Sequence, residues 1–443
     1  MGRKRIGYFN STGLHTGLPI GVKMKNNLYQ AKLKRRAAPA WLVLFVLILA
    51  CLVYAQPAED KSLTLPLGPK PYRGKFLLIE PGKLYSASKG QPIEFGRMMK
   101  EMKKARFIYL GETHDNLDMH EMQFRVIETL YRQDPNLAIG LEQITVDLQP
   151  VLDRWVAGQL DEKTFLKEIR WYVTWSFNYG YYRKIFDLAR EKKLPLFALN
   201  APRNIISKIR MQGYEALSEE EKKIVPPLDL SNEEHRWLLK TIFEAEEIPP
   251  QMKGANLEAM FEGLYRAQVA WDETMGTKAV EVAEATGRRV VVLAGSGHLL
   301  YNLGLNYRAW NKSRQPWATV IGIQVPGNSR IKVSRGLADF IYGVGEKDYP
   351  AYPAFSLSLK KVEGLTNLVV SANPTEPLAR NAGFQKGDVI LTVEDQPVSD
   401  IHDFRLMMAG HNWGDEIKVR VLRNGEVVWL NIRFDPELLK KKN

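Results

Sequence analysis

Two histidines in this sequence end short apolar runs with the same pattern, Gly-x-x-His. The first is His114 and the second is His298. Glu112 lies two residues before His114, and Glu142 follows a third apolar run. Two imidazoles with carboxylate oxygens can hold a divalent cation such as Zn²⁺ or Mn²⁺. Such a cation lowers the pKa of a bound water, and Glu112 or Glu142 would then act as the general base.

Other polar and aromatic side chains lie near the same run ends. The polar ones are Asp115, His120, Asn200 and Arg203. With His114, Glu142 and His298 they form the candidate cofactor-binding set. His120 falls in the second turn of a predicted helix, where a site role and a surface role are equally expected. Residues 171–182 contain seven aromatic side chains in twelve positions, so the same cleft could instead hold a large planar cofactor.

The runs that carry these residues are predicted to be buried strands. Residues 107–111, 137–141, 194–199 and 290–294 lack the alternation of a strand with one exposed face. Amphipathic helices are predicted between them, and this order indicates an α/β fold with a mostly parallel sheet flanked by helices. Ligands bind beyond the carboxyl ends of parallel strands. We therefore expect the polar residues to share one cleft.

Composition divides the sequence into five segments. Residues 1–36 hold nine Lys/Arg and no Asp or Glu, and residues 37–55 are uncharged and mostly apolar. Residues 56–84 are rich in proline and are predicted to be a linker. The α/β domain is assigned to residues 85–345, and a small β-rich domain to residues 349–435.

The basic leader and apolar run predict a membrane segment or signal peptide. A run of this length can span a bilayer, with the basic flank on the cytoplasmic side. The rest of the protein would then be membrane-anchored or exported, facing the periplasm. Cleavage, lipidation at Cys51 and retention all stay open, and Met24 is as suitable a start as Met1.

Charge and cysteine content exclude several classes of function. The net charge of +12 comes largely from the leader, and without its nine basic residues 53 Lys/Arg face 50 Asp/Glu. This near-neutral balance predicts no nucleic-acid binding. Cys51 is the only cysteine and lies in the apolar run, so the exported part has no thiol for a disulfide or a Cys ligand.

Five motifs in the α/β domain resemble a known family. They are Gly111–Asn116, Gly140–Glu142, Ala198–Arg203, Trp271–Met275 and Gly295–His298. In this order they resemble the ChaN-like family of bacterial haem-binding, iron-regulated proteins, within the wider Tiki superfamily. The resemblance implies an extracytoplasmic domain linked to haem binding or haem and iron uptake.

The resemblance also implies a haem ligand and an alternative activity. ChaN-like proteins hold haem through a tyrosinate, and the candidate tyrosines are Tyr179, Tyr181, Tyr182, Tyr265 and Tyr301. Other members of the superfamily resemble metal-dependent proteases. The alternative is therefore a hydrolase or peptidase with His114 and His298 as metal ligands and Glu112 or Glu142 activating water. A third possibility is an adaptor whose α/β domain has no chemistry.

The stretch Ala372–Ile390 resembles a bacterial PDZ domain. Such domains bind protein C-termini or extended peptides by adding a strand to a sheet edge. The expected peptide contacts are Pro353, Ala354 and Phe355. The family usually has glycine where Ala354 stands, and Pro353 lacks an amide donor. A docking lobe that captures no terminal carboxylate is therefore the alternative.

Overall fold

The computed structural model describes residues 60–245, 254, 256–327, 329–362 and 366–440. Residues Gln56–Asn443 form one compact unit. Across the described ranges, no helix combines the length and apolar character needed to cross a bilayer. The predicted membrane segment at residues 37–55 lies outside the described part of the protein.

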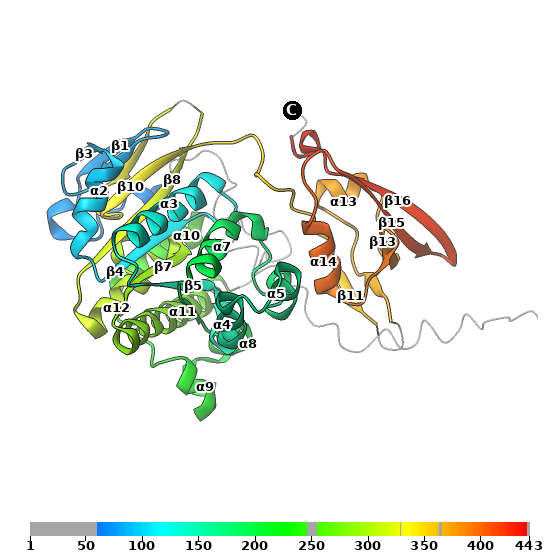
Figure 1. The fold of residues 1–443 in the computed structure, drawn as a ribbon, viewed down its shortest axis with the longest axis horizontal. Helices are drawn as coiled ribbons and strands as arrows, with labels where there is room; N and C mark the ends of the chain where they lie inside the picture. Colours follow the sequence, from blue (N-terminus) through cyan, green and yellow to red (C-terminus); the bar gives the residue numbers. More distant parts are fainter. Residues whose placement is uncertain (1–59, 246–253, 255, 328, 363–365, 441–443) are drawn as a thin grey trace, which may run out of the picture. The chain divides into compact units, whose positions relative to one another are not determined.

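An eight-stranded sheet organises the α/β domain (Figure 1), in the order β3-β2-β10-β8-β4-β7-β5-β6. Its strands are β2 (Leu84–Ser86), β3 (Gln91–Ile93), β4 (Phe107–Glu112), β5 (Leu137–Thr145), β6 (Leu196–Asn200), β7 (Arg289–Gly295), β8 (Trp317–Val325) and β10 (Phe340–Gly345). The pairings from β10 to β6 are parallel. The β10–β2 and β2–β3 pairings of this sheet are antiparallel. The predicted α/β core is confirmed, and its sheet is mixed.

Helices cover both faces of this sheet. They are α2 (Phe95–Glu101), α3 (Leu117–Gln133), α4 (Gln149–Ala157), α5 (Glu162–Glu168), α6 (Trp171–Thr174), α7 (Arg183–Lys192), α8 (Arg203–Gln212), α9 (Glu219–Ile224), α10 (Glu233–Ala245), α11 (Leu257–Thr286) and α12 (Leu305–Ser313). Figure 1 shows α3 and α7 on one side of the sheet and α11 and α12 on the other. The period-2 geometry of a strand explains this: Ile108 of β4 joins the core with α3 and α7. Tyr109 joins the core with α11 and α12.

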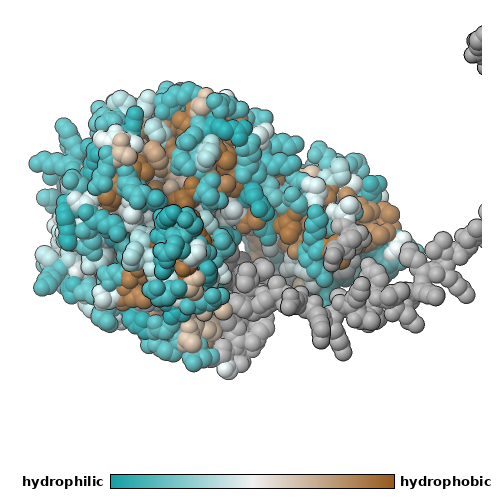
Figure 2. Space-filling model, turned by 90° about the horizontal axis from the view of Figure 1, so that it is seen from below, coloured by the Kyte–Doolittle hydropathy of each residue, from teal (hydrophilic) through white to brown (hydrophobic). Residues whose placement is uncertain are grey.

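A separate antiparallel pair lies beside the main sheet, formed by β1 (Phe76–Ile79) and β9 (Ile331–Ser334). On the face shown in Figure 2, hydrophilic residues cover most of the surface of the α/β domain, with apolar residues between them.

The C-terminal region is β-rich, as predicted. Its strands follow the order β11-β12-β13-β15-β16, with β14 paired to β13. The elements are β11 (Leu359–Lys361), β12 (Leu368–Val370), α13 (Pro377–Asn381), β13 (Val389–Val393), β14 (Gln396–Pro397), α14 (Ile401–Ala409), β15 (Glu416–Arg423) and β16 (Glu426–Arg433). Asn424 and Gly425 join β15 to β16 with positive φ angles of 54° and 90°, as a tight hairpin turn requires.

Candidate functional site

The two Gly-x-x-His segments meet because β4 and β7 are adjacent and parallel. Glu112 at the end of β4 is in register with Gly295 at the end of β7. A Cβ atom on Gly295 would lie 2.7 Å from Cε1 of His114 and 3.6 Å from Oε2 of Glu142. The backbone N–H of Gly295 also donates to Glu142 Oε2 at 2.5 Å. Glycine is needed here because any side chain would fill the place of the His114 ring.

His114 forms a carboxylate–imidazole pair with Glu112. Its Nδ1 lies 2.8 Å from Oε1 of Glu112, and the Tyr182 hydroxyl donates to the same oxygen at 3.0 Å. Burial opposes protonation of His114, but Glu112 and then Glu142 outweigh burial, so the pKa of His114 is raised. Because Glu112 holds Nδ1, the nitrogen left for a ligand is Nε2.

His298 lies between two carboxylates. Its Nδ1 is 2.6 Å from Asp272 Oδ1, and its Nε2 is 3.3 Å from Glu142 Oε1. Burial favours neutral His298, yet Glu142 and Asp272 raise its pKa to about 10. Burial likewise opposes ionisation of Glu142, but His298 and then His114 lower its pKa to about 2. At neutral pH this is an imidazolium beside a carboxylate.

Exposure distinguishes the imidazoles. The side chain of His114 is 18% exposed, against 7% for His298 and 1% for His120. His114 also packs against aromatic rings, with ring centroids 4.6 Å from Trp175 and 4.8 Å from Phe177. His114 is therefore the imidazole of this site that a ligand can reach, and its approach is lined by aromatic surface.

A buried polar network continues behind His298. His235 Nε2 lies 3.5 Å from Asp272 Oδ2, and Nη2 of Arg308 lies 3.2 Å from His235 Nδ1. All three side chains are almost wholly inaccessible to solvent. Burial and the nearby cations of Arg308 and His298 lower the pKa of His235 far below its ordinary value, so it is neutral. Sequence reasoning found neither His235 nor Arg308.

Two other predicted residues support the site from behind. His120 Nε2 lies 3.2 Å from the main-chain oxygen of His114 and 3.8 Å from Glu112 Oε2. His120 is buried, and burial lowers its pKa despite Glu112. The Asn200 amide donates to the main-chain oxygen of Glu142 at 2.9 Å. Both residues therefore position the groups that surround them.

Asp115 and Arg203 have different surroundings. Burial raises the pKa of Asp115, against the effects of a backbone hydrogen bond and of His114. The Arg203 guanidinium donates to the main-chain oxygen of Val173 at 3.2 Å, so it is bound to residues 171–182 and to neither histidine.

A pocket of about 380 Å³ lies away from these residues, along α3 and β10, lined in part by Asp118. Glu112, His114, Glu142, Asn200 and His298 do converge, as a packed cluster at the strand ends.

The five candidate tyrosines are all buried. Burial raises the pKa of Tyr179 and Tyr182 well above the ordinary value. It raises that of Tyr265 to about 12, and that of Tyr301 further. Tyr179, Tyr182, Tyr265 and Tyr301 are therefore neutral phenols in this structure, and a tyrosinate haem ligand stays a prediction. His114 offers a reachable nitrogen with a carboxylate behind it, the usual arrangement of a ligating imidazole.

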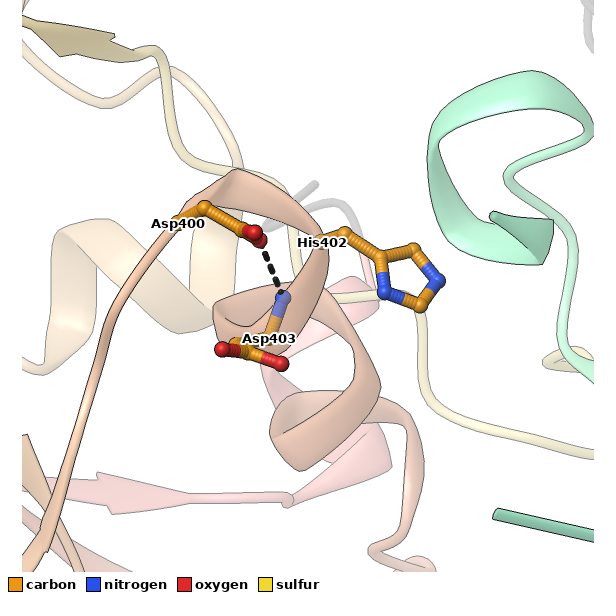
Figure 3. Close-up of side chains that lie close together, drawn as sticks. All are labelled: Asp400, His402 and Asp403. Atoms are coloured by element: carbon orange, nitrogen blue, oxygen red, sulfur yellow. Dashed lines mark hydrogen bonds between the residues drawn. The ribbon is translucent and has the colours of Figure 1, made fainter. Parts of the chain in front are cut away.

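The predicted metal ligands do not form a compact ligand group. Within the described ranges, the one set of three His, Cys, Asp or Glu residues with ligand atoms all within 4.8 Å is Asp400, His402 and Asp403. Figure 3 shows Asp400 accepting from the backbone N–H of Asp403, with the His402 ring pointing away. Asp400 is the N-cap of α14, and Asp403 pairs with Lys167 at 3.0 Å. The proximity of these three residues is therefore explained by N-capping at the start of α14. Metal binding by His114 and His298 stays a prediction.

The predicted peptide contacts lie before β11. Ala354 is exposed and Pro353 is buried. The Phe355 ring packs into the domain core, with its centroid 5.9 Å from that of Phe384 and 6.1 Å from that of Phe404. Strand β11 is the terminal strand of its sheet, so its outer edge could accept an added strand. Peptide binding itself stays a prediction.

These features define a two-part class: an α/β domain with His–carboxylate pairs at its strand ends, followed by a small β-rich domain. Residues 98–308 match the family described as haem-binding uptake, Tiki superfamily, ChaN. Residues 320–434 match the PDZ domain. The protein therefore has a ChaN-like domain followed by a PDZ domain, and that prediction is confirmed. The PDZ match begins within β8, which the structure places in the eight-stranded sheet.

Individual relatives are distant. The chain is 24% identical over 239 residues to Protein RETICULATA-RELATED 5, chloroplastic, of Arabidopsis thaliana, covering 49% of this chain and only 31% of that protein. It is similar to the solved structure titled "Cofacial heme binding to ChaN of Campylobacter jejuni", with 18% identity and a TM-score of 0.46, covering 60% of this chain and 96% of that one. It is also similar to the solved structure titled "HtrA-type protease AlgW with decapeptide", with 30% identity and a TM-score of 0.17, covering 17% of this chain and 27% of that one.

We expect Gly295→Ala to displace the His114 ring without unfolding the domain. The added methyl would meet the end of a side chain, which can move, and would break the pairing with Glu112. The shift is measurable from the ring resonances of His114 in NMR spectra. Gly96→Ala is the matched control, because its methyl would enter open space at the start of α2. Unchanged His114 resonances in Gly295→Ala would contradict the observed packing.

The Glu142–His298 pair should make stability depend on pH in two directions. The pKa of His298 is raised from 6.5 to about 10, so its contribution is complete below pH 6.5 and is lost as pH rises toward 10. The pKa of Glu142 is lowered from 4.5 to about 2, so its contribution is complete above pH 4.5 and is lost as pH falls toward 2. Linkage therefore predicts the largest contribution between pH 4.5 and 6.5. Urea unfolding of wild type and Glu142→Gln should differ most there; a pH-independent difference would refute the assignment.

Proposed function

We propose that the ChaN-like domain binds haem, with Nε2 of His114 as the iron ligand. The observation that carries this proposal is the pairing of the most exposed site imidazole with a buried carboxylate, next to aromatic surface. Glu112 fixes Nδ1 of His114 and makes the ring a stronger donor at Nε2. Trp175 and Phe177 offer flat apolar surface to a planar ligand. Bound haem would supply an iron centre for storage or transfer of haem iron.

We further propose that the protein works on the extracytoplasmic side of a membrane, in haem or iron uptake. The basic leader and the apolar run at residues 37–55 support this location. The PDZ domain would recruit an extended peptide or a protein C-terminus along the edge of β11. Alkaline phosphatase fused after residue 443 should be active if the C-terminal part is exported. An inactive, cytoplasmic fusion would count against the location.

The test of haem binding is titration of the full-length protein, purified in detergent, with hemin. Saturable growth of a shifted Soret band at one haem per protein molecule would support the proposal. A His-ligated haem and a Tyr-ligated haem differ in their visible and electron paramagnetic resonance spectra, so the same sample identifies the ligand. Absence of a saturable band would refute haem binding, and a tyrosinate spectrum would refute the role of His114.

The second candidate is a hydrolase or peptidase, which the His114–Glu112 pair favours. Glu112 orients the ring and would stabilise the imidazolium formed when Nε2 removes a proton from water. His298 would be a fixed positive charge nearby, because it is bound by two carboxylates. In the metal-dependent form, His114 and His298 would instead hold the ion, and Glu112 or Glu142 would activate water. Assay of ester and peptide substrates, with and without Zn²⁺ or Mn²⁺, decides between these two forms.

A further inference from the structure

The aromatic segment, residues 171–182, forms one wall of the His114 site. Trp175 and Phe177 contact the His114 ring, and Tyr182 donates to Glu112. The segment has only one short turn of α-helix, α6, and one 3₁₀ turn at Tyr179–Tyr181. Most of its rings pack into the core of the α/β domain with α3 and α7. The segment also has neighbours on its other side.

That other side contacts the loop before β11. The ring of Tyr352 rests directly on Gly180, where any Cβ atom would overlap it. Tyr352 also packs edge-to-face on Tyr181, with ring centroids 4.9 Å apart. Tyr352 directly precedes Pro353, in the loop where peptide contacts are predicted. The absence of a side chain at position 180 is thus what allows the PDZ loop to reach the segment.

Helix α14 holds the same segment at three further points. Arg405 Nη1 donates to the main-chain oxygen of Tyr172 at 2.9 Å, and the Asn178 amide donates to the main-chain oxygen of Ala409 at 3.2 Å. The rings of Tyr172 and His402 lie 6.5 Å apart. These contacts satisfy main-chain oxygens and partly bury a cationic side chain, so breaking them leaves polar groups unpaired.

We propose that the PDZ domain acts as a clamp on the His114 site, so that occupancy of one domain changes the affinity of the other. The loop at Tyr352 leads into β11, whose outer edge would take an added peptide strand. Phe355 of this loop packs on Phe404 of α14, with ring centroids 6.1 Å apart. A peptide that shifts either of them moves the aromatic segment and hence the rings beside His114. Linkage makes the effect reciprocal. The factor by which bound haem changes the peptide affinity equals the factor by which bound peptide changes the haem affinity. The coupling to haem rests on the proposed function; the clamp itself does not.

The clamp is tested first without haem, by hydrogen exchange on the full-length protein. Arg405→Ala removes the hydrogen bond to Tyr172, and amides of residues 171–182 should exchange about tenfold faster or more. Arg433→Ala is the matched control, because Arg433 is exposed and its ion pair in the described part of the protein is with Glu416 on the PDZ sheet. Arg405→Lys should restore part of the protection. Equal exchange of residues 171–182 in wild type and Arg405→Ala, with α14 intact, would overturn the clamp.

Haem coupling is tested on the same proteins by hemin titration. Arg405→Ala should change the haem dissociation constant by about 5- to 150-fold, the usual range of coupling between sites, while Arg433→Ala should not. Saturating hemin should in turn change exchange in α14 of the wild type. Faster exchange of residues 171–182 with unaltered haem affinity would overturn the coupling and leave the clamp. A wild type that binds no hemin would refute the proposed function, and the exchange result would still decide the clamp.

Discussion

Replacing His114 with alanine is expected to weaken haem binding by more than about 100-fold, because loss of a residue that merely supports a ligating group costs about 10- to 100-fold. Among the described residues His114 is the most exposed imidazole of the site, and Glu112 holds its Nδ1. Hemin titration followed at the Soret band measures the loss. Glu112→Gln keeps the shape of the pair but removes the charge, and it should weaken binding by roughly 10- to 100-fold.

The control for this prediction is His411→Ala. His411 lies in the PDZ domain, stacked on Phe434 with centroids 5.2 Å apart, and its removal should leave haem affinity unchanged. If His114→Ala bound hemin as tightly as wild type, with the same ligand spectrum, another residue would have to hold the iron. Full affinity in Glu112→Gln would instead show that the buried carboxylate does not tune His114.

Replacing Asp272 with alanine is expected to lower the free energy of unfolding by about 3–5 kcal/mol, the usual cost of removing one partner from a buried ion pair. The substitution leaves His298 protonated with a single carboxylate partner and leaves His235 without its neighbour. Urea unfolding at pH 6 measures the change. The difference from wild type should shrink as pH rises toward 10, where the His298 charge that Asp272 stabilises is lost.

Glu281→Ala is the matched control for Asp272→Ala. Both residues are on α11, and Glu281 is exposed and pairs with Lys278 on the surface. Its removal should change stability by less than about 1 kcal/mol, as for other surface ion pairs. Similar losses in the two variants would contradict the buried network and would point to a general weakening of α11.

One feature of the sequence predicted both the α/β fold and the convergence of His114 and His298. Apolar runs without alternation identified β4, β5, β6 and β7, and parallel strands must deliver their carboxyl-end residues to one edge. The sequence could not predict the strand order. The adjacency of β4 and β7, which places Gly295 against His114, depends on packing of residues far apart in the sequence.

Sequence reasoning could not separate the roles of the converging residues. His114 and His298 have the same motif, yet only His298 lies between two carboxylates, because α11 brings Asp272 to it. A signal for this was present: Gln268 and Asp272 are four residues apart, hence on one helix face, and both contact His298 Nδ1. Arg308 and His235 carried no such signal, since each is one of several polar residues in an amphipathic helix.

The position of Trp175 has a practical consequence. An indole whose ring centre is 4.6 Å from that of His114 lies well within the range over which haem absorbs the energy of an excited tryptophan. The fluorescence of Trp175 would therefore be quenched when haem binds beside His114. The protein has ten tryptophans, so the difference between wild type and Trp175→Phe isolates this one optical probe. Haem binding at the strand ends can thus be followed by tryptophan fluorescence, without any label.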